Sequence, residues 1–152
     1  MNRRFMAISD MAGLQIYMIG LVVEDMEASI TFYRRLGLDV PSETDSTHVE
    51  IEMAGGMILF LDSRPERWDS GFEPAPLQKP GTYRSLLEFY LDSEANVKQK
   101  FDEMVSHGYR GVRDAYQTPF DMCFAFLEDP DGNTILLSGD SDPSQTHDNE
   151  PK

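Results

Sequence analysis

The sequence contains very little cysteine and little positive charge. Its single cysteine, Cys123, cannot form a disulfide within the 152-residue chain, and it excludes zinc ribbons and other cysteine-based clusters. The 13 Lys and Arg residues against 27 Asp and Glu residues give a net charge of −14. Such a chain is repelled by phosphates, so the composition predicts no nucleic-acid partner. One cysteine requires no oxidising compartment, which suits a cytoplasmic location.

The sequence also lacks a long hydrophobic run and a glycine-rich phosphate-binding loop. The longest apolar stretch near the start covers residues 14–23, contains Gln15 and Gly20, and is far short of the roughly 20 residues that cross a bilayer. Arg3 and Arg4 resemble the charged start of a signal peptide, but Asp10 interrupts the apolar segment that would have to follow. We therefore expect no membrane partner. Nucleotide binding has no support either, because no glycine-rich segment follows a strand and opens a helix.

What the sequence does contain is an ordered series of strand and helix patterns in its first half. Residues 15–23 form an apolar run rich in branched side chains, which predicts a strand. Asp25 is a suitable N-cap for the helical pattern that follows, and Gly37 provides its left-handed end. Three short strands are then predicted at residues 38–43, 48–53 and 57–61. The first half is predicted to be β-α-β-β-β.

The second half repeats this order. A strand is predicted at residues 85–91, followed by a helix that Asp92 or Ser93 caps and Gly108 ends. Further strands are predicted at residues 109–114, 123–128 and 134–138, and the sequence Asp-Pro-Asp-Gly at 129–132 is a strong turn signal between the last two. The repeated order indicates an internal duplication.

The composition divides the chain into five segments. These are a flexible N-terminus at 1–12, a first module at 13–62, a proline-rich connector at 63–84, a second module at 85–139, and a disordered acidic tail at 140–152. The connector has no periodicity but contains Trp68, Phe72 and Tyr83, so we expect it to fold over another part of the protein. Because residues 139–152 have nothing large and apolar to bury, we expect their removal to leave stability unchanged.

Three segments of the two modules point to a family. The sequences VED at 23–25, SITFY at 29–33 and EDPDGN at 128–133, placed in two β-α-β-β-β modules, resemble the vicinal-oxygen-chelate superfamily. That superfamily contains glyoxalase I, extradiol dioxygenases, fosfomycin-modifying enzymes and bleomycin-resistance proteins. The resemblance covers residues 14–139. It implies an α+β fold in which the two modules form a curled mixed sheet around a cavity, and it implies a homodimer.

The resemblance also implies a metal site with four ligand positions, one on the first and one on the last strand of each module. In this sequence those positions hold apolar residues: Met18, Phe60, Leu86 and Leu136. Thioether and hydrocarbon side chains cannot replace the carboxylate and imidazole ligands that hold a divalent ion. We therefore expect no metal at the family's site, and no cofactor.

Alternate residues of these strands point into the same cavity, which makes Glu88 and Tyr90 candidates. Glu88 is a lone carboxylate among apolar neighbours, where desolvation favours a general base or an anchor for a cation. The alternative is a structural role, in which Glu88 pairs with Arg84, Arg110 or Arg113.

Two further features have a functional and a simpler interpretation. His48, Glu50 and Glu52 alternate along one strand, which indicates a solvated face, a chance metal site or the rim of the cavity. Trp68 lies in a polar connector, from which an aromatic lid would stack on a planar or cationic ligand.

These features favour a metal-free protein, similar to the bleomycin-resistance type, that binds a small planar or cationic organic ligand. The predicted binding residues are Met18, Phe60, Trp68, Leu86, Glu88, Tyr90 and Leu136. The first alternative is a glyoxalase- or dioxygenase-like enzyme, either with a non-standard metal site around His48, Glu50 or Glu88 or with Glu88 as general base. The second is a binding or regulatory module without a small ligand.

Overall fold

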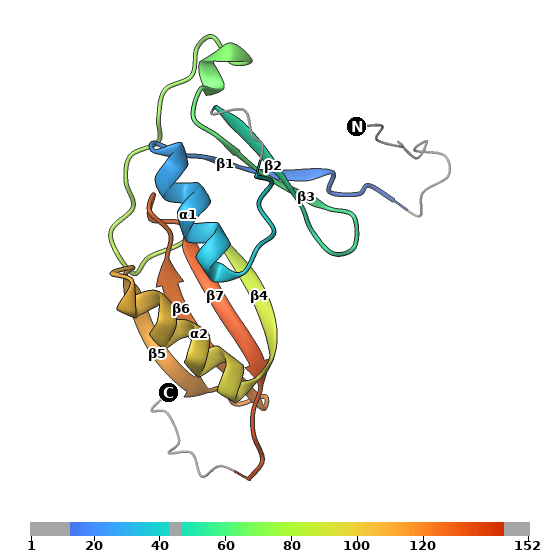
Figure 1. Cartoon of the computed structure of the whole chain (residues 1–152), viewed down its shortest axis with the longest axis vertical. Coiled ribbons are helices and arrows are strands. Elements are labelled where there is room, and N and C mark those ends of the chain that lie inside the picture. The colour runs from blue at the N-terminus through green and yellow to red at the C-terminus, as the bar shows by residue number, and fades with distance from the viewer. Residues whose placement is uncertain (1–12, 43–46, 145–152) are drawn as a thin grey trace.

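The computed structural model describes residues 13–42 and 47–144. The first module contains β1 (Met18–Val22), α1 (Met26–Leu36), β2 (His48–Glu52) and β3 (Ile58–Asp62), shown in blue to green in Figure 1. The strands form a sheet in the order β1-β3-β2, in which β3 is parallel to β1 and antiparallel to β2. Strand β3 is therefore the centre of this sheet, and β1 and β2 are its edges.

The second module repeats the first and has one more strand. It contains β4 (Leu86–Ser93), α2 (Glu94–Ser106), β5 (Gly111–Gln117), β6 (Met122–Glu128) and β7 (Thr134–Asp140). The sheet order is β4-β7-β6-β5, with β4 parallel to β7 and the other pairs antiparallel. The α+β fold with a repeated β-α-β order is confirmed.

The strand that we predicted at residues 38–43 is absent from the described part of that segment, residues 38–42. Instead, the Leu38 N–H turns back to the carbonyl of Tyr33, and the Val40 N–H bonds the carbonyl of Leu38. The next residue, Pro41, has no N–H to offer a sheet. Among the described residues, the first sheet therefore has three strands where the second has four.

Both predicted helix starts are present. The Asp25 carboxylate accepts a hydrogen bond from the Ala28 N–H at 3.2 Å, and α1 ends at Gly37, whose φ is +123°. Of the two candidates for the start of α2, Ser93 is the cap, because its hydroxyl accepts from the Asn96 N–H at 3.2 Å. These local signals were sufficient to predict where the two helices start, because each cap bonds a backbone group within its own helix.

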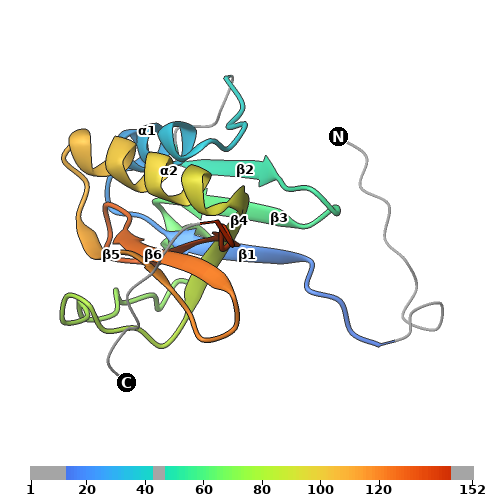
Figure 2. The same cartoon turned by 90° about the horizontal axis from the view of Figure 1, so that it is seen from below.

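The two helices cover one side of the sheets, and the connector runs along the other side, as Figure 2 shows. Helices α1 and α2 contact each other, and buried residues of both modules form one continuous core. Side chains alternate along a strand, so each sheet has a buried face toward the helices and an open face away from them. The open faces are where a ligand could bind.

The predicted turn at 129–132 also joins the two modules. The Tyr33 hydroxyl of α1 donates to the buried Asp129 carboxylate at 2.6 Å. The Glu24 N–H and the Ser29 hydroxyl donate to the Asp131 carboxylate at 3.0 and 3.3 Å. Helix α1 is therefore held on the second module by hydrogen bonds as well as by the shared core.

The connector is attached to the protein at both ends. It begins with a short 3₁₀ helix, η2 (Pro65–Arg67), that follows directly on β3. At its far end, the Gly81 N–H donates to the Glu128 carboxylate at 3.2 Å, and the Tyr83 ring stacks on that of Phe126. The expectation that the connector folds over another part of the protein agrees with this arrangement.

The C-terminal end of the second module lies further along the chain than we expected. Strand β7 includes Gly139 and Asp140, which pair with Cys123 and Met122 of β6. The Asp142 N–H then donates to the buried Glu94 carboxylate at 3.1 Å. The start of the expected tail is thus held in place, while residues 1–12 and 145–152 lie outside the described residues. Among those described, no helix is long and apolar enough to cross a membrane.

Candidate functional site

The open face of the first sheet combines apolar and acidic side chains. The register places Gly20 of β1 beside Phe60 of β3, and Phe60 beside Glu50 of β2. Residues in such a cross-strand row point to the same side of the sheet. By the same register, Met18, His48, Glu52, Ile58 and Asp62 lie on this face. The row of His48, Glu50 and Glu52 therefore shares a face with the predicted binding residues Met18 and Phe60.

The Phe60 ring lies across the backbone of its neighbour on β1. A Cβ atom at Gly20 would overlap the far edge of this ring, so the close approach requires glycine at that position. On its other side, Phe60 faces the His48 imidazole, with the ring centroids 5.2 Å apart and the planes 32° from parallel. An aromatic pair thus occupies the position where the family would place a metal ligand.

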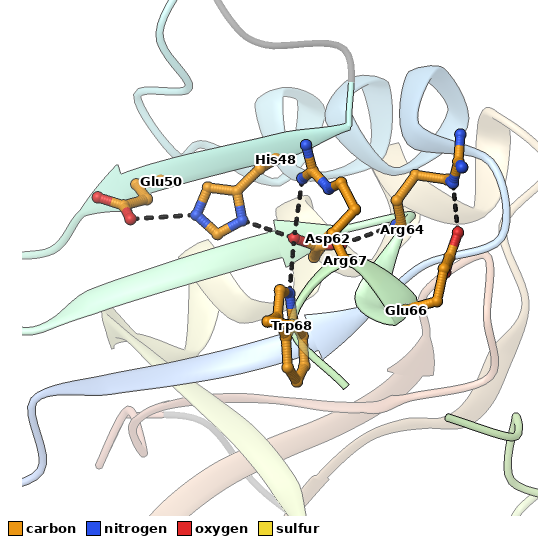
Figure 3. A network of polar contacts seen from close by, with 7 residues as sticks. All are labelled: His48, Glu50, Asp62, Arg64, Glu66, Arg67 and Trp68. Atoms are coloured by element: carbon orange, nitrogen blue, oxygen red, sulfur yellow. Dashed lines mark hydrogen bonds and ion pairs between the residues drawn. The ribbon is translucent and has the colours of Figure 1, made fainter. Parts of the chain in front are cut away.

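His48 lies between two carboxylates (Figure 3). Its Nδ1 is 2.7 Å from Asp62 Oδ2, and its Nε2 is 3.1 Å from Glu50 Oε2. The His48 and Glu50 side chains are 32% and 28% exposed, whereas Asp62 is fully buried. The interpretation of this strand face as simply solvated is therefore incomplete, because two of its three polar side chains are held in a hydrogen-bonded network.

Asp62 is the centre of that network. Its Oδ1 accepts from the Arg64 N–H at 2.7 Å, and its Oδ2 lies 3.4 Å from the indole nitrogen of Trp68 and 3.5 Å from a guanidinium nitrogen of Arg67. Burial raises the pKa of the Asp62 carboxyl, but the hydrogen bonds from His48, Arg64 and Trp68 outweigh burial, so the pKa is lowered. Asp62 thereby fixes the start of the connector to the first sheet.

This network holds Trp68 next to Asp62, at the first sheet (Figure 3). Its ring is 59% exposed while its indole N–H points to Asp62. From the sequence we expected Trp68 to be a lid that closes over a ligand held by Glu88. The structure links its indole N–H to Asp62 instead, a carboxylate of the first module.

The open face of the second sheet carries Glu88 and Leu136 in one row. The register aligns Glu88 of β4 with Leu136 of β7, and Leu136 with Phe126 of β6. Glu88 is exposed to solvent and accepts a hydrogen bond from the Ser138 hydroxyl at 2.7 Å. From the sequence we expected the Glu88 carboxylate to be desolvated. In the structure it is accessible to solvent on this face.

Two of the three arginines that we considered as structural partners of Glu88 have other neighbours. Arg110 lies 3.5 Å from the Glu128 carboxylate, and the Arg113 guanidinium lies 3.5 Å above the centre of the Tyr116 ring. Ser138 is thus the partner that the structure gives to Glu88. A hydroxyl leaves the negative charge of the carboxylate uncompensated, which keeps Glu88 suitable for binding a cation.

The remaining predicted residues of this face differ in accessibility. Leu86 is half-buried beside Thr134, and Leu136 is buried. Tyr90 is 53% exposed, and hydrogen bonding to Asp140, together with burial and nearby carboxylates, raises the pKa of its hydroxyl. Tyr90 is therefore tied to the C-terminal end of β7, at the far end of this face.

A cleft of about 230 Å³ opens on the same face beside Phe126. Tyr83 from the connector stacks on Phe126, with the ring centroids 5.9 Å apart and the planes 26° from parallel. The lining residues are Gly81, Tyr83, Val112, Arg113, Tyr116, Phe126 and Thr134. The connector residue that covers the second sheet is thus Tyr83.

The cleft residues were missed as a site by the sequence argument. Phe126 belongs to a strand with an aromatic residue at every second position (124 and 126), a pattern that also fits ordinary core. Tyr83 was noticed as an aromatic in the connector, but no local pattern states which sheet such a residue will cover. The signal that could have found Tyr83 is its position just before the strand predicted at residues 85–91. This closeness in the chain keeps its side chain near the second sheet.

The residues at the family's metal positions do not fit a metal ion. Met18 and Phe60 on the first sheet, and Leu86 and Leu136 on the second, offer no nitrogen or oxygen ligand. Within residues 13–42 and 47–144, no three His, Cys, Asp or Glu side chains are grouped so as to hold a metal. No step that uses a metal can be derived from these side chains.

Comparison with known proteins identifies relatives of this arrangement. The family model described as Glyoxalase/Bleomycin resistance protein/Dioxygenase superfamily matches residues 15–137. No curated protein matches the chain. A hypothetical protein from S. aureus has a similar structure, with a TM-score of 0.70, 16% identity, and coverage of 88% of this chain and 99% of that one.

Two similar structures carry functional descriptions. A glyoxalase-related enzyme from Fulvimarina pelagi has a TM-score of 0.67 and 24% identity, covering 85% of this chain and 88% of its own. A lactoylglutathione lyase from Agrobacterium tumefaciens has a TM-score of 0.60 and 20% identity, covering 85% of this chain and 96% of its own. At these identities the likeness concerns the fold alone.

Proposed function

The chain belongs to the glyoxalase/bleomycin resistance protein/dioxygenase superfamily, and we propose that it binds and sequesters a small planar organic compound, neutral or cationic, without a metal. One observation carries this proposal. The open face of the second sheet combines an aromatic cleft with the exposed carboxylate of Glu88, while the family's metal positions are apolar. Aromatic walls and a few polar groups are typical of small-molecule sites.

The charge of the protein supports the preference for a cation. A net charge of −14 raises the local concentration of cations near the surface and repels anions. Glu88, held by Ser138 at 2.7 Å, is an oriented carboxylate on the binding face. A hydrogen bond between a carboxylate and a cationic group contributes more than a neutral one. Glu88 would therefore select a cationic compound over a neutral compound of the same shape.

Replacing Glu88 with glutamine tests this role. We expect Glu88→Gln to weaken binding of benzylamine about tenfold, because 1.4 kcal/mol, the order of one charge-assisted hydrogen bond, corresponds to a factor of ten. Binding of benzyl alcohol, a neutral compound of similar shape, should be unchanged. Both affinities can be measured by isothermal titration calorimetry or ligand-observed NMR. Glu27→Gln removes the same charge from α1, on the helix side of the protein, and serves as the control. Equal weakening of both compounds by Glu88→Gln would assign Glu88 a structural role.

The alternative is an enzyme of the glyoxalase or dioxygenase kind, and the network around His48 favours it. A histidine oriented by a buried carboxylate is a common arrangement for proton transfer, and Glu50 lies 3.1 Å from its second nitrogen. Glu88 acting alone as general base is the other form of this alternative. Elemental analysis distinguishes the two functions. About one equivalent of Ni, Zn, Fe or Mn per chain, lost on replacing His48, Glu50 or Glu88, would favour the enzyme.

A homodimer is the assembly that we propose for this protein. Strand β1 is an edge of its sheet, and the apolar side chains of Leu14 and Ile16 just before it are 91% and 69% exposed. Tyr17 and Val22 on the same segment are each 42% exposed. An unpaired edge with exposed apolar residues favours association with a second copy, which would cover it in a two-fold interface.

Light scattering at micromolar concentration is expected to give twice the 17.3 kDa mass of the chain. Ile16→Glu should shift the mass toward that of the monomer, because the interface would have to bury a charge. Leu77→Glu, at a connector residue that is 88% exposed, is the matched control and should leave the mass unchanged. A monomer mass for the unaltered protein would contradict the dimer.

A further inference from the structure

The ring of Tyr83 lies on the open face of the second sheet, although Tyr83 belongs to the connector and not to a strand. It stacks on Phe126 of β6, with the ring centroids 5.9 Å apart and the planes 26° from parallel. Phe126 is 9% exposed, whereas Tyr83 is 48% exposed. In this pair, Phe126 is therefore the inner ring, which belongs to the sheet, and Tyr83 is the outer ring, which reaches solvent.

The connector holds Tyr83 in this position through a turn just before it. The Gly81 N–H donates to the buried Glu128 carboxylate of β6 at 3.2 Å. The Thr82 N–H and the Thr82 hydroxyl both donate to the carbonyl of Lys79, at 3.1 and 2.6 Å. Gly81 has a φ of +83°, which glycine adopts without strain. The backbone two residues before Tyr83 is thus fixed to the strand that carries Phe126.

The space beside this ring pair accepts one ring. The cleft that Tyr83 and Phe126 line has a volume of about 230 Å³. An apolar cavity of about 150 Å³ binds benzene, and ten ring carbons in place of six would need about 250 Å³ on the same scale. One ring with a short substituent therefore fits beside Tyr83, whereas a second fused ring would have to stay in solvent. Without the Tyr83 ring, that second ring could stack on the face of Phe126.

We propose that Tyr83 determines the size of the ligand, because its ring occupies the position on Phe126 that the second ring of a planar compound would take. The protein with Tyr83 in place then selects compounds with a single aromatic ring. This inference rests on the proposed function, because it assumes that a small planar compound binds the open face of the second sheet. It adds the number of rings that the site accepts and the residue that sets this number.

Benzyl alcohol and 2-naphthalenemethanol test the proposal, because these neutral probes carry one and two rings with the same substituent. We expect Tyr83→Ala to weaken binding of benzyl alcohol, which loses one wall of its site. The same variant should strengthen binding of 2-naphthalenemethanol, whose second ring gains the face of Phe126. The ratio of the two affinities should change about tenfold, which corresponds to 1.4 kcal/mol, the scale of one aromatic contact. Isothermal titration calorimetry or ligand-observed NMR measures both affinities.

Two variants serve as controls for Tyr83→Ala. Tyr83→Phe keeps the ring and removes the hydroxyl, so it should keep the affinity ratio of the unaltered protein. Leu77→Ala shortens an apolar side chain of the same connector that is 88% exposed and does not line the cleft, and it should also keep this ratio. A melting curve for each variant checks that the fold is retained. In Tyr83→Ala, nuclear Overhauser effects between 2-naphthalenemethanol and the Phe126 ring should report the stacked second ring.

The outcomes distinguish this inference from the proposed function. Equal weakening of both probes by Tyr83→Ala would make Tyr83 a wall of the cleft and no more, and would overturn the inference. A changed ratio in Tyr83→Phe would overturn it as well. If Glu88→Gln selectively weakens benzylamine while Tyr83→Ala leaves the ratio unchanged, the proposed function stands without this inference. Failure of both probes to bind either the unaltered protein or Tyr83→Ala would overturn both. Opposite effects of Tyr83→Ala on the two probes, absent from the controls, would support it.

Discussion

Replacing Asp62 with alanine is expected to lower the free energy of unfolding by about 3 kcal/mol, since removal of one partner from a buried charged network costs several hydrogen bonds at once. Asp62 is fully buried and accepts from His48 Nδ1 and from the Arg64 N–H, each at 2.7 Å. In a domain of this size the change corresponds to a drop in melting temperature of roughly 6–12 °C. Chemical denaturation and thermal melting followed by circular dichroism measure it.

The stability that Asp62→Ala loses is expected to depend on pH. The pKa of Asp62 is lowered by its hydrogen bonds, so the folded protein binds this proton less readily than the unfolded chain. The contribution of the ionised carboxylate is fully present above the ordinary pKa of 3.8 and is lost as the pH falls through the lower value of the folded state. The difference in free energy of unfolding between the unaltered protein and Asp62→Ala should therefore have its full size at pH 7 and should decrease below pH 3.8.

Glu66 provides the matched control for Asp62. It lies on η2 and pairs with Arg64, close to Asp62 in the chain, but both partners are exposed. An exposed pair is screened by solvent, so Glu66→Ala should leave the melting temperature unchanged. The single tryptophan, Trp68, gives a second measurement, because its indole N–H points to Asp62. Its fluorescence should change in Asp62→Ala and not in Glu66→Ala. If Asp62→Ala melted at the same temperature as the unaltered protein, that result would contradict the role of Asp62 as the anchor of the connector.

Deletion of residues 139–152 is expected to destabilise the protein by about 3 kcal/mol, the scale of several lost hydrogen bonds. This reverses the expectation drawn from composition. The deletion removes the pairing of Gly139 and Asp140 with β6 and the bond from the Asp142 N–H to Glu94. Glu94 is 2% exposed, so the loss of a hydrogen bond to its buried carboxylate is costly.

Deletion of residues 145–152 is the control for this truncation. It leaves all the bonds described above in place, so the melting temperature should stay well above that of the protein without residues 139–152. The two truncations have to be compared at the same pH and ionic strength, because both remove acidic residues. Equal stability of the two would show that the β7 extension and the bond to Glu94 contribute nothing.

The sequence by itself determined those features that depend on neighbouring residues. The cap at Asp25, the end of α1 at Gly37 and the turn at 129–132 are each made within a few residues, and the alternation of side chains decided which faces of the strands are open. Periodicity and repetition were sufficient for the α+β fold and the duplication, because the same local patterns occur twice, and the segments at 23–25, 29–33 and 128–133 carried the resemblance to the family. They also placed Met18, Phe60, Leu86 and Leu136 on the open faces.

The tertiary structure decided which segments meet, and local patterns carry no information about that. Trp68 was expected to form a lid over the ligand, with no sheet specified; the buried Asp62 holds it at the first sheet, and Tyr83 covers the second. Glu88 has apolar neighbours along its strand but is exposed, because nothing in the described chain covers it. The cleft joins connector residues to strands β5, β6 and β7, whose closeness follows from packing across the whole chain. Contacts between distant segments depend on which surfaces the shared core leaves available, and that is settled only when all elements pack together.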